Sequence, residues 1–319
     1  MSEPHFSPRP ASRLPALVVG TMNFGRRTPE PEAKRIVDAA LAHGLVLFDT
    51  ANAYGDGESE RILGRVLGPR RDDVLIATKV GWWRKEGLAA ARVRASLDES
   101  LARLGTDRVD LYYLHVPDHE TPIEATLAGV ADVLASGKAR RFAISNYASW
   151  QALEVLLACD RLGVPRPAVA QQLYNLLIRQ LDLEYLRFAR RYDLHTTVYN
   201  PLAGGLLARV PADVDAAATP GSRFHKNALY QRRYLSTAFV EATRAFDTLA
   251  REAGLDLVTL AYAWLAQRPG VDSILVGPGT AQHLEAAVRA VATPLSPEVV
   301  AGVDAIHLAL VGTDASYAR

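Results

Sequence analysis

Hydrophobic positions along this chain follow two alternating periods. Short apolar runs rich in β-branched residues, such as 74–79, are each followed by a longer segment in which apolar residues recur every three or four positions, such as 31–43. The first pattern predicts a buried strand and the second an amphipathic helix. Eight strands are predicted: Leu17–Val19, Leu45–Asp49, Val74–Lys79, Val109–His115, Arg141–Ser145, Ala168–Gln171, Thr196–Tyr199 and Ser273–Val276.

The predicted helices lie between these strands and after the last one. Two of their ends carry local signals: Pro31 suits the first helical position, and Gly105 suits the residue that follows a helix. A long insertion, from about residue 200 to 235, follows the seventh strand. The predicted helices are Pro31–His43, Glu58–Leu67, Ala89–Leu104, Pro122–Ser136, Ala148–Arg161, Leu181–Tyr192, Ala238–Ala253, Leu257–Gln267, Ala281–Val291 and Pro297–Leu310.

Eight strand–helix units follow one another without a break in composition. Strands separated by helices pair in parallel, and eight such units favour a closed barrel over an open sheet. The sequence therefore predicts an α/β fold, a (β/α)8 TIM barrel, as a single domain over residues 1–319.

The charge balance excludes some partners. The chain has 36 Lys and Arg against 35 Asp and Glu, a net charge of +1. Nucleic-acid-binding proteins usually show a basic excess, so we expect no nucleic-acid partner. An anionic ligand would have to be recognised by local contacts, because the chain has no strong overall field.

The chain has one cysteine, Cys159, so no intrachain disulfide is possible. It lies in an apolar run and is expected to be a small buried side chain in a reducing compartment. Residues 1–10 lack the apolar core of a signal peptide, and no apolar run reaches the length of a membrane span. We expect a cytoplasmic protein with no membrane contact.

Candidate chemistry gathers at the ends of three consecutive strands. Asp49, Lys79 and His115 end the second, third and fourth strands, and Tyr54 follows Asp49 by five residues. In such barrels the carboxyl ends of the strands form the active-site face, so the four side chains are expected to meet there. Each residue taken alone is more often structural, and the combination carries the prediction.

The four residues make chemical sense as a proton-donating site. A free tyrosine has a pKa of about 10, and a nearby ammonium lowers it. We expect Lys79 to do this for Tyr54, with Asp49 balancing the lysine charge. His115 would hydrogen-bond both the phenol and the carbonyl oxygen on which negative charge develops. No metal site is expected.

At these residues the sequence resembles the aldo-keto reductases. The resemblance rests on segments 48–55 (FDTANAYG), 78–80 (TKV), 97–107 (LDESLARLGTD) and 109–115 (VDLYYLH). It implies that Asp49, Tyr54, Lys79 and His115 form a catalytic tetrad for reduction of an aldehyde or ketone. It also implies an extended nicotinamide cofactor without a Rossmann fold, and the chain has no Gly-x-Gly-x-x-Gly after a strand.

The resemblance is strongest to the aflatoxin aldehyde reductase subfamily. It rests on segments 115–119 (HVPDH), 145–148 (SNYA) and 199–207 (YNPLAGGLL). It implies that Ser145, Asn146 and Gln171 bind the carboxamide and that Tyr199 stacks on the nicotinamide ring. The cofactor-binding residues it implies are Gly20, Thr21, Met22, Asp49, Ser145, Asn146, Gln171, Tyr199, Asn200, Leu202, Gly277, Thr280 and His283.

The stretch after the eighth strand departs from the family pattern. Aldo-keto reductases often place Lys or Arg there to hold the 2′-phosphate, whereas residues 277–283 read GPGTAQH. Backbone N–H groups at the start of the next helix, with Thr280 and His283, are expected to bind the phosphate instead. We expect NADPH as cofactor, with NADH less favoured.

The substrate side of the site is predicted from the same subfamily, which reduces small aldehydes, some of them carboxylated. Arg233 in the insertion and the terminal Arg319 resemble positions that face the pocket, and Arg suits a carboxylate. Trp82 is expected to form an apolar wall. The simpler alternatives are solvated arginines and a tryptophan packed on the barrel rim.

Two other functions remain open at this point. Potassium-channel β subunits share the fold, so a cofactor-binding regulatory subunit with little turnover is the main alternative. A Schiff-base isomerase is disfavoured, because an Asp beside Lys79 would keep the amine protonated. The expected partner is a small aldehyde or ketone, with or without a carboxylate. The sequence is also compatible with a homodimer.

Overall fold

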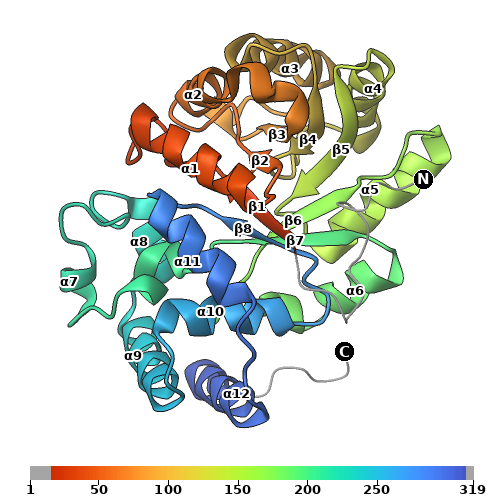
Figure 1. Ribbon diagram of the computed structural model, residues 1–319. Helices are drawn as coiled ribbons and strands as arrows, with labels where there is room; N and C mark the ends of the chain where they lie inside the picture. The colour runs from red at the N-terminus through yellow and green to blue at the C-terminus, as the bar shows by residue number, and fades with distance from the viewer. Residues whose placement is uncertain (1–15, 314–319) are drawn as a thin grey trace.

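The computed structural model describes residues 16–313 and forms one closed barrel of eight parallel strands (Figure 1). The strands pair in chain order, and β1 closes the ring against β8. The predicted (β/α)8 fold is confirmed. The strands are β1 (Ala16–Gly20), β2 (Leu47–Asp49), β3 (Leu75–Val80), β4 (Val109–Leu114), β5 (Ala139–Ser145), β6 (Val169–Leu173), β7 (His195–Tyr199) and β8 (Ser273–Val276).

Helices surround the strands, and the described chain also has short 3-10 segments. The α-helices are α1 (Glu30–Ala42), α2 (Glu58–Leu67), α3 (Ala90–Leu104), α4 (Ile123–Ala135), α5 (Ser149–Leu162), α6 (Tyr185–Arg191), α7 (Val214–Ala217), α8 (Ala228–Tyr234), α9 (Thr237–Glu252), α10 (Leu257–Gln267), α11 (Ala281–Val291) and α12 (Pro297–Val311). The 3-10 segments are η1 (Gly68–Asp73), η2 (Trp83–Lys85), η3 (Gln180–Asp182) and η4 (Ala203–Ala208).

The predicted insertion at about 200–235 is a partly helical segment between β7 and α9. It contains η4, α7 and α8. In Figure 1 it lies on the same flank of the barrel as α1 and α11, and these two helices also contact each other. The insertion therefore borders the end of the barrel near β1 and β8.

One predicted helix, Leu181–Tyr192, is wrong as a single element. The structure divides it into η3 and α6, because Glu184 has φ −157° and ψ −28°, outside the helical region. The carboxylate of Glu184 accepts a hydrogen bond of 2.5 Å from the hydroxyl of Ser149 at the start of α5. This contact between distant segments accompanies the break in the helix at Glu184. The sequence around Glu184 alone gives no indication of it.

The core lies in two layers. Inside the barrel, small and aliphatic side chains pack around Tyr113, with Ala77, Leu111, Ala143 and Val169. A larger apolar layer fills the space between the strands and the outer helices. Cys159 belongs to this outer layer, where burial raises the pKa of its thiol to about 12, so the expectation of a buried side chain is confirmed.

Helix α2 packs unusually close to the end of α3 at Gly64. A β-carbon built on Gly64 would lie 2.2 Å from the backbone oxygen of Leu104. The chain turns out of α3 at Gly105, whose φ of +65° is the left-handed conformation expected of a glycine after a helix. The backbone there cannot move aside easily, so only glycine fits at position 64.

Replacing Gly64 by alanine is expected to lower the free energy of unfolding by about 2–3 kcal/mol, as overpacking does in a rigid contact. Urea denaturation monitored by circular dichroism measures this as a lower midpoint with an unchanged slope. The matched control is Gly302→Ala in α12, where the new β-carbon meets only the flexible side chain of Leu249. Equal stability of the Gly64→Ala variant and the parent protein would contradict the close approach.

No helix among residues 16–313 combines the length and the apolar character needed to cross a membrane.

Candidate active site

A cavity of about 1190 Å³ opens at the carboxyl ends of the strands, beneath the insertion. It extends from the ends of β2, β4 and β5 to the loop after β8. Of the residues predicted for the site, the ones that line it are Gly20, Met22, Asp49, Tyr54, Trp82, His115, Ser145, Asn146, Gln171, Tyr199, Asn200, Leu202, Arg233, Gly277, Thr280 and His283.

Lys79 and Asp49 form an ion pair on the inner face of the barrel. Both side chains are almost completely buried. The ammonium of Lys79 donates one hydrogen bond to Oδ1 of Asp49 and another, of 2.8 Å, to the carbonyl oxygen of Thr50. Burial lowers the pKa of Lys79, and the Asp49 carboxylate opposes that effect. Lys79 lies behind the cavity wall and acts on the site through its charge.

Tyr54 lies half-buried at the cavity, above this pair. The centre of its ring is 5.2 Å from Nζ of Lys79. The pKa of Tyr54 is nevertheless raised well above its usual 10, first by burial, then by the negative charge of Asp49 and by the neighbouring Tyr230 and Tyr199. The expectation of a lowered pKa for Tyr54 is therefore wrong, because burial and the charge of Asp49 raise it although Lys79 lies nearby.

His115 completes the group from the end of β4. Its ring is 5.9 Å from that of Tyr54, edge to face, and 5.3 Å from that of Trp82. Burial, helped by Lys79, lowers its pKa well below 6.5, so the imidazole is neutral at pH 7. Within the described chain, its buried Nδ1 has no hydrogen-bond partner. A polar ligand atom could therefore gain a hydrogen bond at this nitrogen.

The side chain of Asn146 forms hydrogen bonds with residues at the ends of β4, β5 and β7. Its amide donates to the backbone oxygen of His115 (2.9 Å) and to Oγ of Ser145 (3.0 Å). Its side-chain oxygen accepts a hydrogen bond of 2.6 Å from the hydroxyl of Tyr199. The residue has φ +65°, a left-handed conformation that costs free energy in a non-glycine residue and that Asn tolerates better than most. The site floor is therefore fixed by side-chain hydrogen bonds.

Two of the predicted residues that the structure describes, Thr21 and Lys79, do not lie at the cavity wall. Thr21 is fully buried, and its hydroxyl donates to the backbone oxygen of Asp49 and shares a hydrogen bond with Ser59, so it supports β2 from behind. Lys79 is buried behind Asp49, as described above. Arg319 lies outside the described residues.

Sequence reasoning missed two features of the site. The amide of Gln171 donates to Oδ2 of Asp49 (2.9 Å), so Gln171 belongs to the buried charge network. Arg223 of the insertion donates to Oδ1 of Asn23 (2.8 Å) and to the hydroxyl of Tyr230 (3.3 Å), and its charge acts to lower the pKa of Tyr54. Residues 221–227 have no periodicity that would have singled out this arginine.

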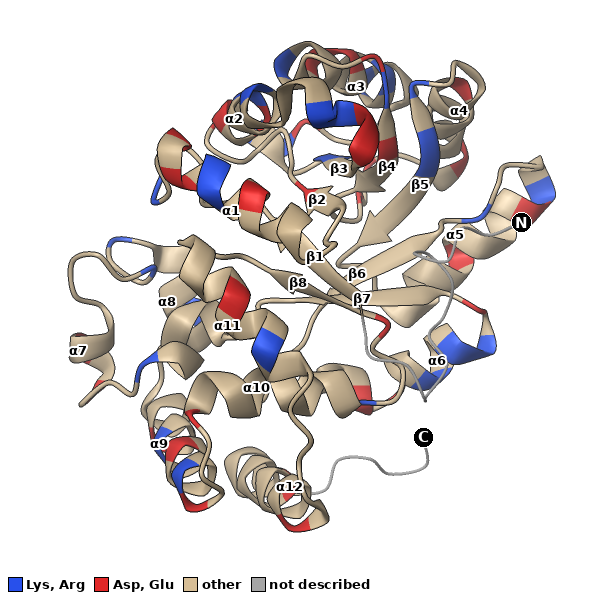
Figure 2. Ribbon diagram, viewed as in Figure 1, with Lys and Arg blue, Asp and Glu red and all other residues tan. Residues whose placement is uncertain are grey.

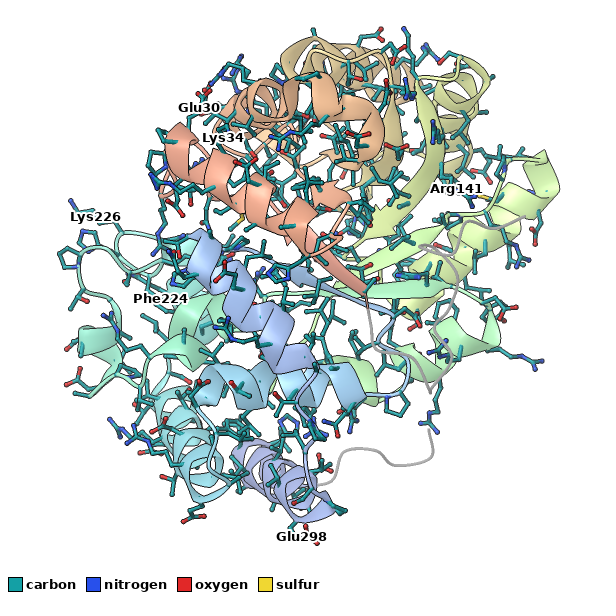
Figure 3. The ribbon with its side chains drawn as sticks, viewed as in Figure 1. Glu30, Lys34, Arg141, Phe224, Lys226 and Glu298 are labelled. Atoms are coloured by element: carbon teal, nitrogen blue, oxygen red, sulfur yellow. The ribbon has the colours of Figure 1, made fainter. Side chains whose placement is uncertain are left out.

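The insertion carries a second arginine to the same wall. The guanidinium carbon of Arg233 is 5.9 Å from the ring centre of Tyr230, and that of Arg223 is 5.4 Å from the same ring. In Figure 3, Phe224 lies on the barrel side of the insertion and Lys226 at its outer edge, which illustrates the two faces of this segment. Two cations thus flank one tyrosine at the cavity.

Elsewhere the charges are mixed in sign. Figure 2 shows Lys and Arg interspersed with Asp and Glu over the outer helices, without a face of one sign in this view. Within residues 16–313, no group of three or more His, Cys, Asp or Glu side chains is arranged to hold a metal ion.

Comparison with known proteins identifies the family. The model of the aldo/keto reductase family matches residues 16–308. The chain is 36% identical to aflatoxin B1 aldehyde reductase member 2 of Mus musculus, over 93% of this chain and 86% of that protein. It is 35% identical to the human protein of the same name, over 92% of this chain and 86% of that one. It is also 32% identical to a probable voltage-gated potassium channel subunit beta of Oryza sativa, over 89% and 90%.

The chain belongs to the aldo-keto reductase family of oxidoreductases, which use nicotinamide cofactors. The family resemblance predicted from residues 48–115 is thereby confirmed.

Proposed function

We propose that this protein reduces an aldehyde or ketone to the alcohol with NADPH, or less favourably NADH, and that Tyr54 donates the proton. The observation that carries the proposal is the placement of Tyr54. Its ring lies at the cavity, 5.2 Å from Nζ of Lys79 and beside the neutral ring of His115.

The residues present fit a nicotinamide dinucleotide. The cavity is lined both by residues at the ends of β2, β4 and β5 and by residues after β8, and the half-buried ring of Tyr199 lines its wall as a platform for a flat heterocycle. Ser145, Asn146 and Gln171 lie nearby for the carboxamide, and Gly277 to His283 border the far end. When bound, the cofactor supplies the hydride that reduces the carbonyl carbon.

The chain's own residues handle the proton. Because the pKa of Tyr54 is raised, its phenol carries the proton throughout the neutral pH range. As negative charge grows on the substrate oxygen, the phenol donates its proton to that atom. Lys79, held by Asp49, then stabilises the phenolate that remains, and the neutral His115 donates a hydrogen bond to the same oxygen.

The substrate side favours an anionic carbonyl compound. Arg223 and Arg233 flank Tyr230 at the cavity, where a carboxylate would meet two guanidinium groups. Trp82 lines the wall next to His115, with 42% of its surface exposed. A small aldehyde with a carboxylate at its other end fits these contacts, with its carbonyl at Tyr54. Arg319, predicted to join this clamp, stays a proposal because it lies outside the described residues.

Replacing Arg233 by alanine is expected to raise KM for a carboxylated aldehyde about tenfold, the effect of losing one charged contact of about 1.4 kcal/mol. Steady-state kinetics should show no such rise for an uncharged aldehyde of similar size. Arg232→Ala is the matched control, because Arg232 carries the same charge and is exposed beside it. An equal rise in KM for both aldehydes would contradict a carboxylate contact.

A regulatory subunit with little turnover remains the second candidate, supported by the similarity to the potassium-channel subunit of Oryza sativa. The arrangement of Tyr54, Lys79, Asp49 and His115 favours turnover. A screen of aldehydes and ketones with NADPH, followed at the absorbance of the reduced cofactor, separates the two. Turnover of at least one substrate class supports the enzyme, and binding of NADPH without turnover of any substrate favours the regulatory reading.

A further inference from the structure

Helix α1 places a carboxylate against the first turn of α11. Oε1 of Glu32 accepts a hydrogen bond of 2.9 Å from the backbone N–H of Ala281, the first residue of α11. Its Oε2 accepts one of 2.6 Å from Arg35, and only 16% of the Glu32 side chain is exposed. The two helices lie side by side in Figure 1 and contact each other. Glu32 is thus held in place by both helices.

This carboxylate lies behind one end of the cavity, because it bonds to Ala281, whose neighbours Thr280 and His283 line the wall there. Tyr54, Asn146 and Tyr199 lie at the catalytic end, whereas Thr280 and His283 line the opposite end, beyond β8. An extended dinucleotide whose nicotinamide lies on Tyr199 would bring its adenosine half toward the start of α11. This placement rests on the proposed function.

The backbone N–H groups expected to bind the 2′-phosphate are partly in use. The N–H of Ala281 is paired with Glu32, and the N–H of His283 is capped by the hydroxyl of Thr280 at 3.3 Å. A negative charge therefore stands where the sequence alone predicted an anion site. A helix start favours negative charge, and here Glu32 supplies it.

Arg35 offsets part of the charge of this carboxylate, but 65% of its side chain is exposed, so solvent screens the ion pair. Arg27 donates to the backbone oxygen of Gly221 and Arg223 to Asn23, so both are engaged with the insertion and the β1 loop. Residues 277–283 contain no Lys or Arg.

We propose that Glu32 is a specificity-determining residue that disfavours the 2′-phosphate of NADPH and makes the protein tolerant of NADH. A carboxylate repels a phosphate, and Glu32 also occupies the backbone N–H of Ala281 that a 2′-phosphate would otherwise use, whereas an unphosphorylated ribose carries no charge to be repelled. The packing of α1 against α11, about 250 residues further along the chain, places the carboxylate of Glu32 there.

The test is the substitution Glu32→Gln. Glutamine keeps an oxygen that accepts from the N–H of Ala281, so the helix contact is preserved while the charge is removed. Dissociation constants for NADPH and NADH are measured by quenching of tryptophan fluorescence, without substrate. The variant is expected to bind NADPH about tenfold more tightly, the size of one like-charge contact at a partly exposed site. Binding of NADH should stay the same or weaken.

The matched control is Glu30→Gln. Glu30 (Figure 3) lies on the same helix and loses the same charge, but it pairs with Arg65 at 2.8 Å, away from α11. The ratio of the two dissociation constants should not change in this variant. A second variant, Glu32→Ala, should shift the ratio in the same direction as Glu32→Gln, and the shift should shrink in high salt.

The outcomes separate the inference from the proposed function. An unchanged ratio in Glu32→Gln, with both dinucleotides still bound, overturns the role of Glu32 and leaves the proposed function intact. A shift of equal size in Glu30→Gln also overturns it, because the effect would then be one of net charge. If neither dinucleotide binds to the parent protein, the proposed function fails, and the inference fails with it.

Discussion

Replacement of Tyr54 by phenylalanine is expected to reduce kcat for carbonyl reduction by about two to four orders of magnitude, the range of a lost general acid. Affinity for NADPH should change little, because the substitution removes only a hydroxyl group at the cavity. The physical reason is the raised pKa of Tyr54, which keeps the phenol protonated and available as a donor at neutral pH. Kinetics and fluorescence titration on the same preparation measure the two quantities.

Tyr113→Phe is the matched control for this experiment. The ring centre of Tyr113 lies 5.4 Å from Nζ of Lys79, almost as close as that of Tyr54, but the side chain is buried inside the barrel and does not line the cavity. Most of the activity should remain in this variant. Comparable activity in Tyr54→Phe and the parent protein would refute Tyr54 as the proton donor.

Replacement of Lys79 by methionine is expected to lower the free energy of unfolding by about 3–5 kcal/mol and to reduce kcat strongly. The substitution leaves the buried carboxylate of Asp49 without its cation, and an uncompensated buried charge has a cost of this size. The hydrogen bond from Gln171 to Asp49 offsets only part of that cost. Chemical denaturation gives the stability, and steady-state kinetics give the activity.

A double-mutant cycle with Asp49→Asn tests the coupling of this pair. The double variant should be more stable than the sum of the two single losses predicts, because it removes both charges. Additive losses of stability would mean that Lys79 and Asp49 do not depend on each other. The double variant should remain nearly inactive, which separates the stability of the barrel from its chemistry.

The order of strands and helices in the barrel could be predicted from the sequence, because each element is marked by residues within or next to it. The bounds of α10, β8 and α11 agree with the prediction to the residue, since Asp256 and Thr280 cap the helix starts and the strand is a short apolar run. The break at Glu184 could not be predicted in this way, because it accompanies a contact with Ser149, 35 residues away.

The residues of the candidate site could be predicted from the sequence, but their long-range contacts could not. Asp49, Tyr54, Lys79 and His115 could be found because strand ends in a barrel meet at one face. The direction of the pKa shift of Tyr54 could not, because it depends on the burial of the phenol and on its nearness to Asp49, Tyr230 and Tyr199 in the folded chain. The contact of Glu32 with Ala281 joins positions 249 residues apart and leaves no pattern in either segment.

The two arginines that flank Tyr230 both come from the insertion, whereas the residues proposed to handle the proton lie between positions 49 and 115, at the ends of three strands. Under the proposed function, substitutions of Arg233 are therefore expected to change which carbonyl compounds are accepted with little effect on Tyr54, whereas Arg223 and Tyr230 also influence the pKa of that phenol. If the proposed roles hold, a position such as Arg233 could evolve toward a new substrate while the residues that handle the proton are retained.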